Sequence, residues 1–238
     1  MIELKNITYI VKENGKDKLV LDNISCVFPD KCLTVITGQN GSGKSTLTKI
    51  IMGIVKATSG SVLYNGEDIT NLKINERANL GINYAFQQPV GFQGITVKEL
   101  IDIATHKENN FSHACDYLAK VGICAKEYIN REFNKTLSGG EQKRVELALA
   151  LAKKGDCLIF DEPEAGIDLW SFEKLIDLFD KSKCNIIVSH QQKVLETADK
   201  IMVLNQGKIE MFGDKLQVLK KLNLSKCSKL KGGRDEIR

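Results

Sequence analysis

A glycine-rich segment is the part of the sequence whose residue types most clearly indicate chemistry. Residues 38–46 read Gly-Gln-Asn-Gly-Ser-Gly-Lys-Ser-Thr and match the pattern G-x-x-x-x-G-K-[ST]. Glycines let backbone N–H groups turn toward phosphate oxygens, and the start of a helix adds its positive dipole end. Lys44 can reach β- and γ-phosphates, and the Ser45 hydroxyl suits Mg²⁺. We therefore predict a nucleotide-phosphate site formed by Gly38, Gln39, Asn40, Gly41, Ser42, Gly43, Lys44, Ser45 and Thr46. A glycine turn before a helix is the simpler alternative.

Two carboxylates follow an apolar run further along the chain. Residues 157–160 are apolar, and Asp161 and Glu162 come directly after them. Open α/β sheets bind ligands at the carboxyl ends of their strands. Asp161 is predicted to hold Mg²⁺ through water, and Glu162 to orient or deprotonate the water that attacks the γ-phosphate. Alone, the pattern also fits a solvated strand end; the phosphate loop upstream favours the functional interpretation.

A serine and two glycines precede a long apolar-periodic segment at residues 137–142, Leu-Ser-Gly-Gly-Glu-Gln. Ser138 is a good helix N-cap, and Gly139 and Gly140 leave the following backbone N–H groups accessible. A helix N-terminus of this kind can bind an anion. A simple N-cap without a ligand is the alternative interpretation.

Two further polar residues directly follow apolar runs. His190 comes after residues 185–189, where it could contact a γ-phosphate or the attacking water. Gln87 comes after residues 81–86 and just before Pro89, which disfavours a helical conformation at the residue preceding it. We expect Gln87 to begin a hinge loop.

The elements that must position these residues follow from apolar periodicity. Strands are expected at 2–10, 20–28, 32–37, 81–86, 157–160 and 185–189, with strand pairs at 60–69 and 200–212. Helices are expected at 44–55, 97–105, 112–121, 141–153, 169–181 and 192–198. The first two strands, joined by a turn at 13–17, should be antiparallel. This alternation predicts an α/β fold interrupted by a helical lobe.

We expect one domain across residues 1–238. Residues 1–86 and 155–215 should form the α/β core, and residues 87–154 the helical lobe. Residues 216–238 should form a C-terminal helix and a basic tail that is partly disordered, since residues 220–238 hold seven basic and two acidic side chains.

Composition excludes several classes. The net charge of +4 indicates no nucleic-acid partner. No apolar run approaches the roughly 20 residues of a membrane span, and no signal segment opens the chain, so a cytoplasmic protein is expected. The seven cysteines contain no C-x-x-C pair and favour reduced thiols over a metal site.

Taken in order, these motifs resemble the ATPase subunits of ABC proteins, from residue 1 to about residue 215. The match comprises the phosphate loop, Gln87, the 137–142 segment, the Asp161–Glu162 pair, "AGID" ending at Asp168, and His190. The resemblance implies a P-loop ABC ATPase core with an N-terminal antiparallel β part and an inserted α-helical lobe. It implies ATP and Mg²⁺ as cofactors, with Gln87 reaching Mg²⁺ or the attacking water.

The resemblance also implies a head-to-tail pair with a second copy of the chain. Ser138, Gly139 and Gly140 of one chain would close over the γ-phosphate at Lys44 of the other, and Asp168 would lie at the seam. One departure concerns the aromatic residue that usually stacks on adenine, because Val11 aligns there. Tyr9 is two positions earlier on the same strand face, and either residue could contact the base.

The segments 75–96, 165–175 and 190–209 are most similar to the SufC-type ATPases of iron–sulfur cluster assembly, which do no transport. That similarity implies scaffold partners of the SufB/SufD type. The alternative is a transporter subunit whose partners are transmembrane permeases. The groove beside Gln87 would receive the partner in either case.

Overall fold

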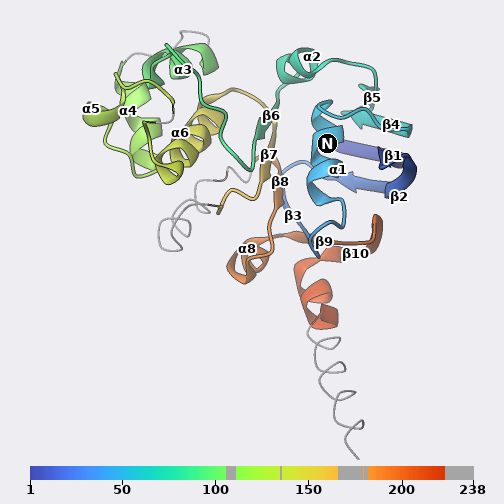
Figure 1. Ribbon diagram of the computed structural model, residues 1–238. Coiled ribbons are helices and arrows are strands. Elements are labelled where there is room, and N and C mark those ends of the chain that lie inside the picture. The colour runs from blue at the N-terminus through green and yellow to red at the C-terminus, as the bar shows by residue number, and fades with distance from the viewer. Residues whose placement is uncertain (106–110, 135, 166–178, 180–181, 223–238) are drawn as a thin grey trace, which may run out of the picture.

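The structure is a computed structural model that describes residues 1–105, 111–134, 136–165, 179 and 182–222. Two sheets and a group of helices make up the described part (Figure 1). Both the α/β class and its antiparallel N-terminal part are confirmed.

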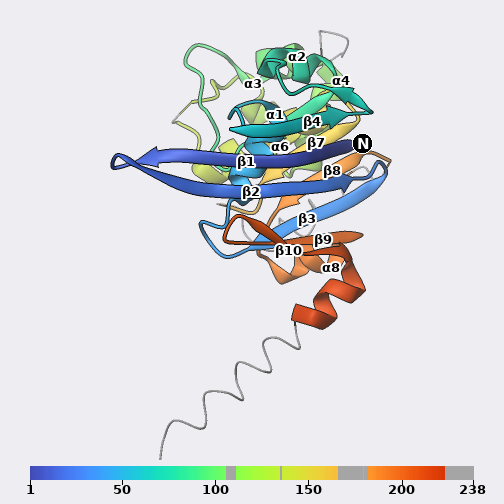
Figure 2. The same ribbon diagram turned by 90° about the vertical axis from the view of Figure 1, so that its right-hand side faces the viewer.

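The first sheet has four antiparallel strands in the order β2-β1-β4-β5. They are β1 (Ile2–Glu13), β2 (Lys16–Phe28), β4 (Ser59–Tyr64) and β5 (Glu67–Asp68). β1 and β2 run beyond their expected ends, and their hairpin projects from the body of the molecule (Figure 2). The extra residues are mostly charged, and all of them except Val11 are exposed, so apolar alternation did not mark where the strands end.

The second sheet has six strands in the order β10-β9-β3-β8-β7-β6. They are β3 (Cys32–Gly38), β6 (Ile82–Ala85), β7 (Cys157–Asp161), β8 (Cys184–Val188), β9 (Lys200–Asn205) and β10 (Lys208–Asp214). All neighbours are parallel except β9 and β10, which form the expected hairpin. Parallel strands are covered on both faces, which explains their short, continuously apolar sequences.

Side-chain alternation in the second sheet divides the apolar core into two. In β7, Ile159 packs with α1 and the first sheet, whereas Leu158 and Phe160 pack with the helices on the other face. α1 (Lys44–Met52) lies between the two sheets (Figure 1). α8 (Gln192–Thr197) covers the opposite face near β3.

The remaining helices are α2 (Ile74–Asn79), α3 (Val97–Ala104), α4 (Phe111–Lys120), α5 (Ala125–Tyr128) and α6 (Gly139–Ala152). α3 to α6 gather beyond the β6 edge of the sheet (Figure 1). α2 and α5 were not expected. The four residues of α5 make about one turn, which is too short to show periodicity, and α2 has only one large apolar residue, Ile74.

Two boundaries differ from expectation for local reasons. α1 ends at Met52 rather than at residue 55, because Gly53 is a left-handed C-cap with φ +78°. A Cβ at Gly53 would lie 2.9 Å from Nε of Arg77, whose guanidinium donates to the carbonyls of Ile50 and Ile51. α6 begins at Gly139, directly after its N-cap.

Some expectations fall on parts that the structure leaves undescribed. The helix at 169–181 lies almost wholly outside the described residues, as does the tail from residue 223. Residues 215–222 are helical. Within the described ranges, no helix is long and apolar enough to cross a bilayer.

Candidate functional site

A cavity of about 610 Å³ lies where the carboxyl ends of the parallel strands meet the β1–β2 hairpin. The phosphate loop and the start of α1 line its inner end, and Gln87, Glu162 and His190 face it from the segments after β6, β7 and β8. Strand polarity explains this convergence, since the carboxyl ends of parallel strands share one sheet edge. Residues far apart in sequence therefore meet here, as predicted.

The phosphate loop has a backbone that only glycine accommodates at two positions. Gly38 has φ +145°, and a Cβ there would lie 2.0 Å from the carbonyl oxygen of Leu204. Gly43 has φ +97°, and its Cβ would lie 2.6 Å from Cδ2 of Leu21. Gly43 is also the N-cap of α1 and makes no side-chain cap hydrogen bond. The first N–H groups of α1 are thus presented to the cavity without a competing side chain.

Two buried side chains complete the loop. Lys44 Nζ donates to the carbonyl oxygens of Gly38 and Gln39, at 2.9 Å each. Burial lowers the pKa of Lys44, and the nearby carboxylates of Glu162 and Asp161 act in the opposite direction. Ser42 Oγ is buried and has no hydrogen-bond partner among the residues that the structure describes. An unpaired hydroxyl, a cation and free backbone N–H groups together fit a polyphosphate.

Asp161 is held by two hydroxyl groups at the end of β7. Ser45 Oγ donates to its Oδ1 at 2.8 Å, and Tyr84 OH donates to its Oδ2 at 2.9 Å. The Asp161 residue is 1% exposed. A serine hydroxyl, a carboxylate and the nearby Gln87 amide are oxygen donors of the kind that Mg²⁺ prefers. Tyr84 was not among the predicted site residues, because in the sequence it is one residue of an apolar strand.

Glu162 lies opposite Gln87. Gln87 Nε2 donates to Glu162 Oε2 at 2.6 Å. The backbone of Glu162 has φ +47°, in the left-handed region that non-glycine residues rarely adopt. Backbone strain of this kind clusters at functional sites.

A second buried carboxyl links the segments after β7 and β8. The Glu162 N–H donates to the carbonyl of Val188 at 3.0 Å, and Ser189 Oγ donates to Oε1 of Glu164. Burial raises the pKa of Glu164, while Ser189 and His190 favour its ionised form. These bonds fix Glu162 relative to His190, which is exposed and faces the cavity. Glu164 was not among the predicted site residues.

Residues 137–142, named the signature segment from here on, do not line this cavity. Ser138 caps α6: its Oγ accepts from the Glu141 N–H at 3.3 Å, and Glu141 Oε2 accepts from the Ser138 N–H at 2.7 Å. Tyr128 OH donates to Oε1 of Glu141, which lowers the pKa of that carboxyl. Ser138 and Gly139 are exposed, and Ser138, Gly139 and Gly140 are not among the residues that line the cavity. The structure therefore does not bring them to the phosphate loop of their own chain.

A buried ion pair on α6, Lys143–Glu146, is hydrogen-bonded to the backbone of Phe86, the residue before Gln87. Lys143, 1% exposed, donates from Nζ to the carbonyl of Phe86 and to Glu146 Oε2, the latter at 3.0 Å. The Phe86 N–H in turn donates to Glu146 Oε1 at 2.7 Å. Burial raises the pKa of Glu146, and Lys143 opposes that effect. The helix that carries the signature segment is thus bonded to the backbone that carries Gln87.

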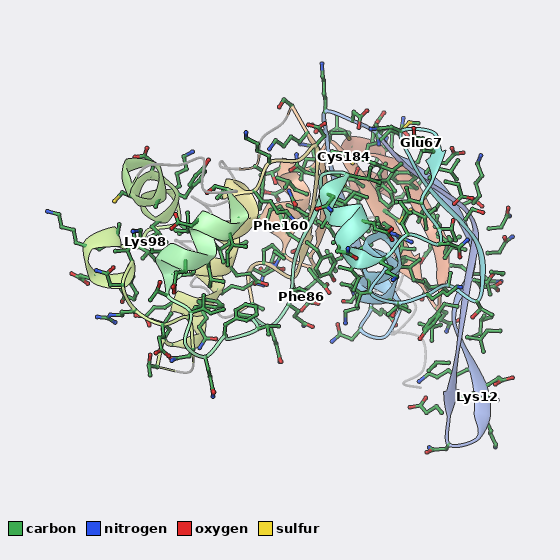
Figure 3. The ribbon with its side chains drawn as sticks, turned by 90° about the horizontal axis from the view of Figure 1, so that it is seen from above. Lys12, Glu67, Phe86, Lys98, Phe160 and Cys184 are labelled. Atoms are coloured by element: carbon green, nitrogen blue, oxygen red, sulfur yellow. The ribbon has the colours of Figure 1, made fainter. Side chains whose placement is uncertain are left out.

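The outer end of the cavity is aliphatic and charged. Val11, Leu19 and Val20 line it together with Lys12, Glu13 and Lys18. Lys18 Nζ donates to Glu13 at 2.7 Å, and Figure 3 shows Lys12 far out on the hairpin. Tyr9 is not among the lining residues and packs against the apolar core instead.

Asp168, expected at the seam between two chains, lies outside the described residues.

Comparisons with known proteins agree with this geometry. The family model described as "ABC transporter" matches residues 21–165. An uncharacterized ABC transporter ATP-binding protein of Methanocaldococcus jannaschii is 34% identical, over 88% of this chain and 90% of that protein. The energy-coupling factor transporter ATP-binding protein EcfA1 of Mycoplasma mobile is 34% identical, over 97% of this chain and 86% of that protein. The iron–sulfur cluster assembly protein SufC of Plasmodium berghei is 33% identical, over 90% of this chain and 63% of that protein.

Solved structures give the same result. A dimeric structure of a bacterial ABC transporter cassette has a TM-score of 0.82 and 26% identity, over 90% of this chain and 99% of that one. The same cassette in a post-hydrolysis state bound to ADP and phosphate has a TM-score of 0.81 and 25% identity, with the same coverage.

The parallel sheet, the phosphate loop after β3 and the carboxylates at the end of β7 define a nucleotide-hydrolysing enzyme of the P-loop class. The chain belongs to the ABC transporter family, whose model matches more than half of its length. It is accordingly an ATPase that binds ATP.

The aliphatic outer end leads to an expectation about base selectivity. Because the lining residues at that end have no aromatic ring, we expect ATP and GTP to bind with affinities within about tenfold of each other. Val11→Tyr should tighten ATP binding by about threefold to tenfold, since a stacked aromatic pair contributes roughly 0.5–1.5 kcal/mol. Competition of each nucleotide against a fluorescent ATP analogue measures both effects, with Ile10→Tyr on the other strand face as the control. A hundredfold preference of the unmodified chain for ATP would contradict the expectation.

Proposed function

We propose that this chain is a Mg²⁺-dependent ATPase subunit that closes head to tail on a second copy around ATP and drives a conformational change in a partner complex. One observation carries the proposal. Ser138 and Gly139 are exposed and do not line the chain's own cavity, although their sequence suits a γ-phosphate. A second copy in the opposite orientation can supply Ser138, Gly139 and Gly140 to the phosphate loop. The solved cassette with the same fold, described as dimeric, supports this arrangement.

In this proposal the chain's own residues act by position and charge. Lys44 and the N–H groups of residues 38–46 hold the β- and γ-phosphates. Ser45, Asp161 and Gln87 would hold Mg²⁺, which offsets negative charge on the phosphoryl group during transfer. Glu162 orients a water molecule and accepts its proton as the water oxygen attacks the γ-phosphorus. The bond to the bridging oxygen breaks, and ADP carries the electron pair. His190, which follows the neighbouring strand β8, contacts the γ-phosphate.

An apolar groove is the proposed site of coupling. A cavity of about 830 Å³ lies between α2, α3, α6 and the end of β6. Five exposed apolar side chains belong to it, namely Ile74, Phe86, Val90, Phe92 and Ile103, and Ile103 is 62% exposed. A contiguous exposed apolar surface of this kind marks a protein interaction site. Phe86 lines the groove, and its backbone is hydrogen-bonded to the Lys143–Glu146 ion pair. A partner in the groove would therefore touch the segment that leads to Gln87.

For the partner we favour soluble scaffold chains of the SufB/SufD type, in the cytoplasm. The resemblance of residues 75–96 to SufC-type ATPases supports this choice, as do SufC relatives at 33% and 32% identity. Transmembrane permease subunits are the second candidate. The energy-coupling factor transporter ATP-binding proteins at 34% and 31% identity favour that candidate.

The experiment is affinity capture with the tagged chain from both soluble extract and detergent-solubilised membranes. We expect soluble scaffold chains, identified by mass spectrometry, to bind the unmodified chain and to be lost with Ile103→Asp in the groove. Leu216→Asp, at an even more exposed apolar residue elsewhere, is the matched control. Recovery of multi-span membrane proteins alone would overturn the SufC-like assignment. Equal capture of the partner by the unmodified chain and by both variants would reject the groove as the partner-binding site.

A further inference from the structure

Tyr84 belongs to two sites at once. It lines the apolar groove described above. Its hydroxyl donates to Asp161 at 2.9 Å and lies 3.3 Å from the hydroxyl of Thr48 in α1. The nucleotide site and the proposed partner site therefore share one side chain.

Strand pairing places Tyr84 in this position. β6 is parallel to β7 with Tyr84 opposite Ile159, so the tyrosine hydroxyl reaches along the strand to the carboxylate two residues further on. On the groove side, the ring of Phe86 packs edge-on against the ring of Tyr84, with centroids 4.9 Å apart and planes at 66°. Phe86 is 37% exposed and lies on the segment between the helices and the core (Figure 3). Any molecule that displaces Phe86 acts directly on the Tyr84 ring.

The hydroxyl of Tyr84 fixes the orientation of a buried carboxylate. Asp161 Oδ1 accepts from Ser45 and Oδ2 accepts from Tyr84. In the proposed function Ser45 is itself a ligand to Mg²⁺ through an oxygen lone pair, which leaves its proton free to donate to Asp161. The bond from Tyr84 to the other carboxylate oxygen then fixes the plane of the carboxylate. A tyrosine hydroxyl carries its proton at neutral pH, so Tyr84 is the donor and Asp161 the acceptor.

We infer that Tyr84 is a positioning residue that orients Asp161 toward Mg²⁺, and that its contact with Phe86 makes this orientation depend on what occupies the groove. The inference rests on the proposed role of Asp161. It adds a physical route between the two sites, with one aromatic contact and one hydrogen bond as its steps.

The test measures metal binding rather than hydrolysis. Mn²⁺ is titrated into the full chain with a non-hydrolysable ATP analogue, and free Mn²⁺ is followed by electron paramagnetic resonance. Tyr84→Phe keeps the ring and removes the hydroxyl. It should raise the dissociation constant for Mn²⁺ about tenfold, in the range found when outer partners of metal ligands are removed. Binding of the analogue in EDTA should stay unchanged. Thr48→Val, which removes the other hydroxyl near Tyr84, should leave Mn²⁺ affinity within about twofold.

A double-mutant cycle tests the route to the groove. Phe86→Ala, at a partly exposed position, should weaken Mn²⁺ binding about threefold in the unmodified background and have no effect in Tyr84→Phe. Equal effects of Phe86→Ala in both backgrounds would reject the coupling, and unchanged Mn²⁺ affinity in folded Tyr84→Phe would overturn the positioning role. Asp161→Asn separates the two proposals. If Asp161→Asn also leaves Mn²⁺ binding unchanged, the proposed metal role of Asp161 fails rather than that of Tyr84.

Discussion

Replacing Glu162 with glutamine is expected to lower ATP turnover about a thousandfold while ATP still binds. Glutamine has nearly the shape of glutamate and can still accept the hydrogen bond from Gln87, but it cannot take a proton from water. A positioned general base contributes roughly 10²–10⁴ in rate, which sets the size of the effect. Phosphate release measures turnover, and a fluorescent ATP analogue measures binding. Glu210→Gln on the exposed side of β10 is the control for the substitution itself.

The same variant tests the pairing of two chains. Because Glu162→Gln holds ATP without consuming it, the closed pair should accumulate and appear as a dimer in size-exclusion chromatography with light scattering. A chain that stays monomeric with saturating Mg-ATP and its partner present would reject the head-to-tail arrangement. A variant that hydrolyses ATP at the unmodified rate would instead reject Glu162 as the base.

Lys44→Ala is expected to weaken ATP binding about a hundredfold or more. The ammonium group faces the loop interior, where it donates to the carbonyls of Gly38 and Gln39 and can turn to the phosphates. Hydrogen bonds to charged groups contribute about 1.5–3 kcal/mol each, and Lys44 is expected to serve two phosphates. Lys49→Ala, one turn further along α1, is the matched control. Circular dichroism verifies that both variants are folded, and unchanged ATP binding in Lys44→Ala would refute the phosphate-loop assignment.

The sequence predicted the parts of the site that follow from strand direction. Gln87, Asp161, Glu162 and His190 each come directly after a short apolar run, and parallel strands bring such positions to one edge. The phosphate loop was predictable because its glycines mark backbone angles that other residues avoid. These inferences need only local pattern and one topological rule.

The residues that the sequence analysis missed depend on contacts between distant elements. Lys143 appears as one polar residue on a helix, and only packing shows that it reaches the carbonyl of Phe86. The hydrogen-bond partners of Tyr84 and Glu164 likewise lie 77 and 25 residues away in the sequence. Local apolar periodicity cannot predict pairs that are so far apart in the sequence.

The choice between Tyr9 and Val11 also depended on a long-range feature. Simple alternation puts both on one strand face, but the β1–β2 register shifts between Tyr9 and Ile10. A shift of this kind bends and twists the hairpin beyond it. Val11 therefore lines the cavity, while Tyr9 packs against the core.

At Glu162 the left-handed backbone lowers the stability of the fold, whereas the carboxylate of the same residue is needed for the proposed hydrolysis. A non-glycine residue with φ +47° carries a strain of about 1–3 kcal/mol. Glycine would relieve that strain, and asparagine would tolerate the angle better, but neither has a carboxylate. Selection of variants for heat resistance alone would thus favour replacing the residue on which hydrolysis is proposed to depend. A screen for a more durable form of this protein must hold position 162 fixed.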